Sequence, residues 1–170
     1  MPEAEIDVTK LPSSFYRVTS RAIVLDGQNR LLTMINRDGN HEIPGGGWEH
    51  DETFEQSLQR ELQEELGVQA KFIGQISGAW LNDHKWWGFK VLRLAAPVEL
   101  ASFDFVPTDT MQSVEWVDKK RFMEIDWKYD ADDKQAVADL IWGENVRSQN
   151  GKRSETIRTD QESQKGNVAE

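Results

Sequence analysis

Short runs of apolar and β-branched residues alternate along the chain with polar turns and with two amphipathic stretches. The runs have the composition of β-strands, and the segments 26–29 and 37–40, rich in Gly, Asp and Asn, are turn signals between them. We expect a hairpin around the polar residues 81–85 and a longer loop at 97–110, which contains two prolines. The predicted strands cover residues 15–25, 30–36, 68–80, 86–96 and 112–117.

Two stretches carry apolar residues at helical spacing. The first is predicted to run from Thr53 to Leu66, because Thr53 and Gln56 fit a capping box and Gly67 fits a left-handed stop. The second covers residues 131–142 and ends at Gly143, and its expected apolar face consists of Ala136, Val137, Leu140 and Ile141. Strands before and after one central helix, followed by a second helix, predict an α/β fold with a mixed sheet covered on both faces.

The polar ends of the chain set the expected limits of the packed domain. Residues 1–14 read as an irregular lead-in, and residues 15–143 hold all the predicted strands and helices. Residues 144–170 contain many polar and charged side chains and almost no large apolar ones, so they cannot bury enough surface to offset the entropy cost of ordering. We therefore predict a flexible tail, with a tail that folds on a partner as the alternative.

The first helix carries three acids near its C-terminal end. Glu61, Glu64 and Glu65 fall within an arc of roughly 100°, next to the apolar stripe of the helix. Like charges at this spacing repel one another, and carboxylates near a helix C-terminus oppose the macrodipole. A bound divalent cation accounts for them, because magnesium prefers carboxylate oxygens and takes further ligands from substrate phosphates. A solvated acidic face is the alternative.

The spacing of fixed residues around these acids is more specific than the acids alone. Five residues separate Gly46 from Glu52, seven more precede Arg60, and the sequence then continues without a gap as Arg60-Glu61-Leu62-Gln63-Glu64-Glu65-Leu66-Gly67-Val68. Residues 46–68 thus resemble the box of the Nudix hydrolase family, whose MutT-like members share it, and every fixed position is filled. The resemblance implies a Nudix-type α/β/α sandwich with a mixed β-sheet.

The resemblance also implies a chemistry. Nudix hydrolases use water to cleave the pyrophosphate linkage of a nucleoside diphosphate derivative, with the help of Mg²⁺ or Mn²⁺. By analogy, Glu61, Glu64 and Glu65 hold the metal, and the Gly45 carbonyl is a further ligand. Either Glu61 or an acid from a later loop then deprotonates the water. Arg60 is expected to orient the neighbouring carboxylate or a loop, with an ion pair to Glu64 as the alternative.

Further site residues are expected outside the box. A fourth acid often comes from a loop in this family, and the candidates here are Asp83, Asp104, Asp109 and Glu115, of which Asp109 is our first choice as a metal ligand. Trp80 and Trp86 flank the predicted hairpin loop, where a base can stack, although packing in the core is the alternative. Tyr16 and Arg17 on the first strand are candidates to hold a base or a phosphate, with a cross-strand role as the alternative.

Charge and composition restrict the partners. The net charge of −10 disfavours long nucleic acids, whereas a small nucleotide depends more on local bases and metal. The sequence has no long apolar run, so we expect no membrane span. The absence of cysteine and of a secretory signal pattern fits a cytoplasmic protein. A homodimer is an expectation drawn from the family resemblance.

The substrate stays open at this stage between a modified nucleoside triphosphate and a nucleotide sugar. Members for ADP-ribose often carry a proline shortly after the box, and this chain has Asn82 and Asp83 in that region. A non-catalytic Nudix-like nucleotide sensor is one alternative, although sensors commonly lose box acids that this chain keeps. Removal of phosphates from RNA 5′ ends is the other, and the absence of a basic stretch disfavours it.

Overall fold

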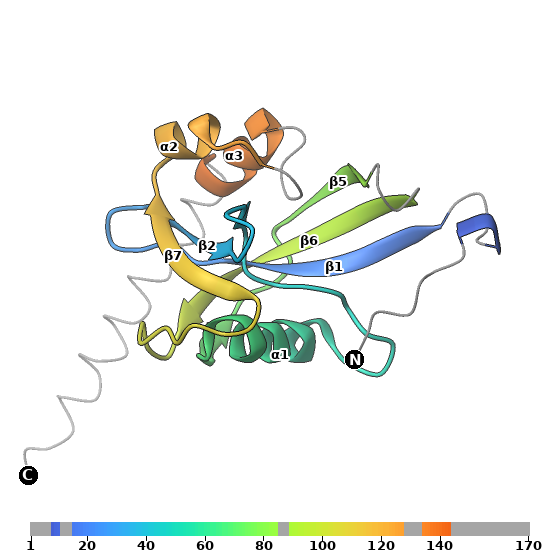
Figure 1. Cartoon of the computed structure of the whole chain (residues 1–170), viewed down its shortest axis with the longest axis horizontal. Helices are drawn as coiled ribbons and strands as arrows, with labels where there is room; N and C mark the ends of the chain where they lie inside the picture. The colour runs from blue at the N-terminus through green and yellow to red at the C-terminus, as the bar shows by residue number, and fades with distance from the viewer. Residues whose placement is uncertain (1–7, 11–14, 85–88, 128–133, 144–170) are drawn as a thin grey trace, which may run out of the picture.

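A mixed β-sheet lies between α1 on one face and α2 with α3 on the other in this computed structural model (Figure 1). The structure describes residues 8–10, 15–84, 89–127 and 134–143. A short 3₁₀ turn, η1 (Val8–Lys10), precedes the sheet. The strands are β1 (Tyr16–Ile23), β2 (Leu31–Asn36), β3 (His41–Glu42), β4 (Ala70–Ile73), β5 (Gly78–His84), β6 (Phe89–Leu100) and β7 (Met111–Val117). The helices are α1 (Phe54–Leu66), α2 (Lys119–Glu124) and α3 (Lys134–Trp142).

The strands form a four-stranded and a three-stranded array. Both arrays pack against α1 on one face and against α2 and α3 on the other. β6 pairs in parallel with β1 and antiparallel with β4 and β5, while β2 lies between β3 and β7. The two arrays meet where β1 leads into β2, through a bridge between Leu25 and Leu31 and a hydrogen bond from the Leu32 amide to the Val24 carbonyl, 2.9 Å. Parallel and antiparallel pairs with helices on both faces confirm the predicted α/β/α sandwich with a mixed sheet.

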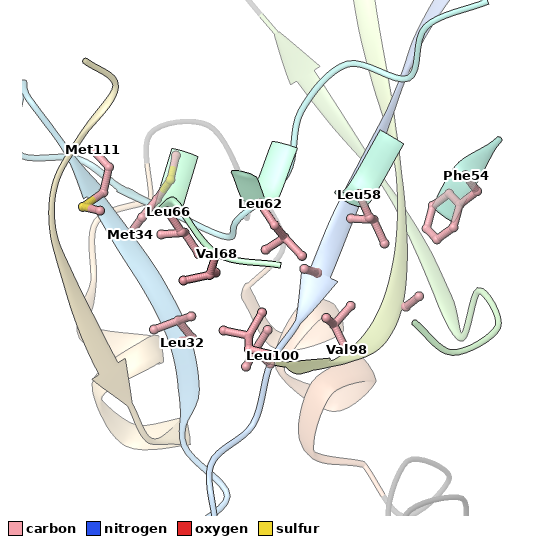
Figure 2. Packing of buried hydrophobic residues seen from close by; sticks show 13 residues of the cluster. Leu32, Met34, Phe54, Leu58, Leu62, Leu66, Val68, Val98, Leu100 and Met111 are labelled. Atoms are coloured by element: carbon pink, nitrogen blue, oxygen red, sulfur yellow. The ribbon is translucent and has the colours of Figure 1, made fainter. Parts of the chain in front are cut away.

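Helix α1 begins and ends where its sequence signals place it. Thr53 is the N-cap and forms a full capping box with Gln56, and Gly67 ends the helix in the left-handed conformation with φ 69°. Its apolar stripe, Phe54, Leu58, Leu62 and Leu66, is buried against the sheet, where it meets Leu32, Val98 and Leu100 (Figure 2). This packing fixes the rotation of the helix, and so decides which way its acids point.

A second core lies on the opposite face of the sheet. It joins Ile23 and Ala95 of the central strands to α2 and α3, and α3 buries Val137, Ala138, Ile141 and Trp142. The predicted apolar face of this helix was therefore partly wrong, because Ala136 is exposed and Leu140 is only partly buried. Helix α2 was not predicted, although Asp118 caps it through a hydrogen bond to the Arg121 amide, 2.7 Å.

One predicted strand and two predicted loops need correction. Residues 68–80 do not form one strand, since β4 ends at Ile73 and β5 begins at Gly78. The Gly74 amide donates to the Pro97 carbonyl at 2.8 Å, and a side chain at Gly74 would meet the Pro97 ring, so the chain turns there. Pro97 lies within β6 rather than in a loop, and β5 continues through the predicted polar loop as far as His84.

The ends of the predicted domain stay predictions. Residues 144–170 and most of residues 1–14 lie outside the described residues, and so does Trp86. Across the described ranges no helix is both long enough and apolar enough to cross a membrane.

Candidate active site

Residues 44–48, which contain the glycine loop, run along the edge of β1 that is not paired with β6. The Ser20 amide donates to the Gly46 carbonyl at 2.9 Å, the Ala22 amide to the Pro44 carbonyl at 2.8 Å, and the Trp48 amide to the Val18 carbonyl at 3.1 Å. A buried hydrogen bond of 2.9 Å between the hydroxyls of Ser20 and Ser57 ties β1 to α1 at the same level. The loop is therefore held between strand and helix.

Side chains from both sides crowd this loop, which explains its glycines. Gly45 has φ 128°, a backbone conformation that L side chains rarely adopt, and a Cβ there would overlap the Ser20 carbonyl. A Cβ at Gly46 would overlap the Glu61 carboxylate, and one at Gly47 would overlap the Arg17 guanidinium. The loop thus lets a carboxylate of α1 and an arginine of β1 approach the bare backbone.

Glu65 is one of the two buried acids of the helix. Its residue is 9% exposed, and its Oε2 accepts a hydrogen bond from the Gly45 amide at 2.8 Å. Burial raises the pKa of its carboxyl well above the ordinary value, while the Arg21 guanidinium and the Gly45 amide act in the opposite direction. Keeping this carboxylate ionised requires positive charge close by.

Glu61 shares the buried side of α1 with Glu65. Burial raises the pKa of its carboxyl, and Arg60 opposes that rise because its Nη1 donates to Glu61 Oε1 at 2.7 Å. Glu64 lies differently, since its side chain is 59% exposed and meets the same Arg60 Nη1 at 3.4 Å. The three box acids thus divide into two buried carboxylates and one at the surface.

Arg60 connects the helix to the glycine loop. Its Nη2 donates to the Gly47 carbonyl at 2.8 Å and to Glu52 Oε1 at 2.8 Å, and its Nε donates to Glu52 Oε2 at 3.1 Å. Together with the bond to Glu61, these contacts touch both groups that the sequence associates with Arg60, the carboxylate and the loop. The alternative ion pair with Glu64 is present as the longest of its contacts.

The Arg60 ion pair gives Glu52 a testable effect on stability. Hydrogen bonds from Arg60 lower the pKa of the Glu52 carboxyl from 4.5 to about 2. Because the pKa is lower in the folded protein, the ionised carboxylate stabilises the fold at any pH above the pKa of the unfolded chain, 4.5. This contribution disappears as the pH falls from 4.5 toward 2. We expect Glu52→Gln to lower the free energy of unfolding by roughly 2–3 kcal/mol near neutral pH, with the difference from wild type vanishing near pH 2.

Urea unfolding of both proteins across this pH range measures the difference. Glu49→Gln is the control, because Glu49 is an exposed acid of the same loop. A difference between Glu52→Gln and wild type that stays constant with pH would contradict the ion pair.

The donors at this site suit a hard divalent cation. Glu61, Glu65 and the Gly45 carbonyl offer oxygen alone, which Mg²⁺ and Mn²⁺ prefer, and two buried carboxylates gain from a positive ion. In the described part of the chain, no three Asp, Glu or His side chains are grouped closely enough to hold a metal. Arg60 draws Glu61 toward the loop, and the Gly45 amide holds Glu65. The oxygen donors are of the kind that the metal prefers. In the structure, Arg60 and Arg21 supply the positive charge that faces the two carboxylates.

Among the acids proposed from later loops, the described side chains of Asp104, Asp109 and Glu115 form no metal-binding group with this pair. Asp104 and Asp109 are exposed, and the main-chain carbonyl of Asp109 accepts from Arg37 Nε at 2.8 Å. Glu115 pairs with His41 Nε2 at 2.6 Å and with Arg121 Nε at 2.9 Å. The side chain of Asp83 lies outside the described residues. Asp109 therefore stays a prediction as a metal ligand; its neighbour Thr108 donates through Oγ1 to the Glu65 carbonyl at 3.1 Å.

The aromatic and basic candidates for substrate binding differ in exposure. Tyr16 is 46% exposed at the start of β1, and Arg17 lies over Gly47 of the glycine loop. Trp80 is half-buried and packs against the core on the α2 and α3 side, as the alternative reading predicted. Among the described candidates, Arg17 is placed against the glycine loop.

Two charged residues near the acids were missed by the sequence reasoning. Arg21 in β1 is 6% exposed and donates through Nη1 to the Gly45 carbonyl. Glu42 in β3 raises the pKa of Glu65 by like-charge repulsion, and its Oε1 accepts from Asn36 at 2.5 Å. The available signal was Arg21 itself, a charged residue directly before the apolar residues Ala22, Ile23 and Val24.

Comparisons with known proteins agree with this architecture. The model of the NUDIX domain matches residues 15–140. Among solved structures, a MutT protein from Methanosarcina mazei Go1 has a TM-score of 0.64 at 17% identity, covering 82% of this chain and 99% of its own. An ADP-ribose pyrophosphatase from Streptococcus suis 89-1591 has a TM-score of 0.56 at 19% identity, covering 74% of this chain and 89% of its own. A UDP-X diphosphatase has a TM-score of 0.60 at 14% identity, covering 80% and 66%.

A search among curated proteins finds no match. The structural likenesses, all below 25% identity, concern the fold. The family match spans most of the chain and includes the complete box on α1. This chain therefore belongs to the NUDIX domain family, as a pyrophosphohydrolase.

Proposed function

We propose that this protein cleaves the pyrophosphate linkage of a small nucleoside diphosphate derivative by attack of water on phosphorus, with Mg²⁺ or Mn²⁺ as cofactor. The observation that carries the proposal is the meeting of two buried carboxylates, Glu61 and Glu65, with the bare backbone of Gly45 and Gly46. Burying two carboxylates costs free energy of folding. Phosphoryl transfer explains their presence, because it requires a metal site and a base.

The residues of the site have separate tasks in this reaction. Glu65 and the Gly45 carbonyl would hold the cofactor, with Glu64 at the solvent side. The metal, when bound, neutralises charge on the phosphate oxygens. Glu61, whose pKa is raised by burial, takes the proton from the attacking water. The new oxygen–phosphorus bond forms as the bridging oxygen–phosphorus bond breaks, and the leaving phosphate carries away the electron pair.

Arg60 holds one of the acids and the glycine loop in place. Its bonds to Glu61 and to the Gly47 carbonyl fix the distance between helix and loop, so we assign it a positioning role. Arg17, whose guanidinium lies over Gly47, is our candidate to bind a phosphate of the substrate at the loop.

The substrate class is proposed from the fold and from the charge of the chain. Similar folds occur in proteins described as a MutT protein, an ADP-ribose pyrophosphatase and a UDP-X diphosphatase, so the fold accommodates several nucleotide derivatives. We propose a modified nucleoside triphosphate or a nucleotide sugar. The excess of acids over bases favours small substrates over long nucleic acids. A cytoplasmic location and a homodimer stay predictions.

A substrate panel tests the proposal. Deoxynucleoside triphosphates, nucleotide sugars, dinucleoside polyphosphates and a triphosphorylated RNA are incubated with the full chain in Mg²⁺, in Mn²⁺ and in chelator. We expect turnover of at least one small nucleotide with metal and loss of at least 100-fold in chelator. Binding without turnover of any compound would contradict the proposal in favour of a nucleotide sensor. If only the triphosphorylated RNA were hydrolysed, the substrate would be an RNA 5′ end and not a small nucleotide.

A further inference from the structure

Arg21 is a buried cation at the point where the proposed site needs one. It lies in β1 with 6% of its surface exposed, and its Nη1 donates to the Gly45 carbonyl and, at 3.3 Å, to the Ser20 carbonyl. The Gly45 oxygen is also the backbone group expected to bind the metal. In the metal-free protein, the Gly45 oxygen that is expected to bind the metal therefore accepts a hydrogen bond from Arg21.

The same guanidinium acts on both buried acids. Arg21 attracts the carboxylates of Glu65 and Glu61, whereas Glu42 adds a third negative charge that repels Glu65. Even with Arg60 paired to Glu61, the three acids Glu42, Glu61 and Glu65 carry more charge than Arg21 and Arg60 together, and this excess of negative charge suits a divalent ion. Arg21 supplies part of the positive charge that such an ion would bring.

We propose that Arg21 is the internal counter-cation of the acid cluster and competes with the divalent metal for the Gly45 carbonyl. This inference rests on the proposed function. Two cations held by one oxygen repel each other strongly in a buried site, where the effective dielectric constant is low. Binding of the metal therefore requires Arg21 to release the Gly45 oxygen. Its freed guanidinium remains next to the loop, where the phosphates of a substrate are negatively charged partners for it.

Competition has a thermodynamic consequence. A side chain that stabilises the metal-free form lowers metal affinity by the same factor by which metal binding weakens its contact, because the two effects are linked. Removing the charge of Arg21 should then destabilise the metal-free protein and tighten the binding of metal. A residue that merely fills space would only lower stability, equally with and without metal.

Arg93 provides a matched control. It is also a buried arginine, 3% exposed, on the neighbouring strand β6 and directly opposite Thr19 of β1. Its Nε donates to Asn82 Oδ1 at 2.7 Å and its Nη1 to Thr19 Oγ1 at 3.5 Å. Arg93→Met removes a buried guanidinium of the same sheet whose bonds run to Asn82 and Thr19.

Calorimetric titration with Mn²⁺ of the wild type, Arg21→Met and Arg93→Met measures the affinity, and thermal melting in chelator and in excess Mg²⁺ measures stability. We expect Arg21→Met to bind Mn²⁺ about tenfold more tightly than wild type, within the usual range of coupling between sites. Its melting temperature should be lower in chelator and recover in Mg²⁺. Arg93→Met should melt lower by the same amount in both conditions and keep the wild-type affinity.

Two further variants keep the test decisive if Arg21→Met does not fold. Arg21→Lys keeps the charge and should bind Mn²⁺ like wild type, whereas Arg21→Gln keeps a donor for the Gly45 carbonyl without the charge and should bind more tightly. Affinity in the neutral variants equal to or weaker than wild type would overturn the competition. A wild type that binds no Mn²⁺ and hydrolyses nothing would instead contradict the proposed function.

Discussion

Glu65→Gln is expected to reduce hydrolysis at least about 1,000-fold while leaving the fold intact. The glutamine oxygen can accept the same hydrogen bond that Glu65 Oε2 accepts from the Gly45 amide, so the loop stays on the helix. The neutral amide also removes a buried carboxylate that burial disfavours, and the melting temperature in chelator should equal or exceed that of the wild type. What is lost is the negative charge toward a metal.

The measurement is kcat and KM with the best substrate of the panel, together with melting curves in chelator and in Mg²⁺. Glu55→Gln is the control, because Glu55 is an exposed acid of the same helix and should keep wild-type kinetics. The stabilisation by Mg²⁺ seen in wild type should disappear in Glu65→Gln. Wild-type turnover by the variant would show that Glu65 does not hold the metal.

Helix α1 shows how far local signals reach. The capping box at Thr53, the left-handed stop at Gly67 and the apolar stripe all act within a few residues, so the sequence determined the bounds and the buried face of this helix correctly. The box spacing could be recognised for the same reason, since it lies on one helix and the loop before it. Features written in one short segment are readable without the rest of the chain.

Features that depend on distant partners were not readable in this way. The chain leaves the sheet at Gly74 because Pro97 lies across from it, and Pro97 is accepted in β6 although proline usually ends a strand. Likewise, the apolar spacing of α3 predicted Ala136 on the buried face, whereas packing buries Ala138 and leaves Ala136 exposed. These outcomes follow from contacts between segments that the sequence does not place side by side.

The site divides along the same line. Glu61, Glu64 and Glu65 follow from the box, but their different exposures follow from the rotation that packing gives α1. Arg21 comes from a strand more than twenty residues away, and only the pairing of β1 with the glycine loop brings it to Gly45. The sequence predicted which acids are present, whereas the fold determines which cations face them.

Gly46→Ala is expected to lower hydrolysis about 100-fold or more, because the added methyl group would occupy the place of the Glu61 carboxylate. The loop cannot easily move away, since the Gly46 carbonyl accepts from the Ser20 amide of β1. Glu61 must therefore turn aside, which breaks its ion pair with Arg60 and removes the proposed base from the site. Steady-state kinetics should show the loss mainly in kcat.

Gly27→Ala is the matched control, because a Cβ at Gly27 meets nothing within 4 Å, and its activity should equal that of wild type. A double-mutant cycle separates displacement of Glu61 from general damage to the loop. If the methyl group acts through Glu61, then Gly46→Ala added to Glu61→Gln costs little further activity, because the base is already missing. Additive losses would place the effect in the loop backbone, and wild-type activity of Gly46→Ala would show that catalysis does not need Glu61 at this position.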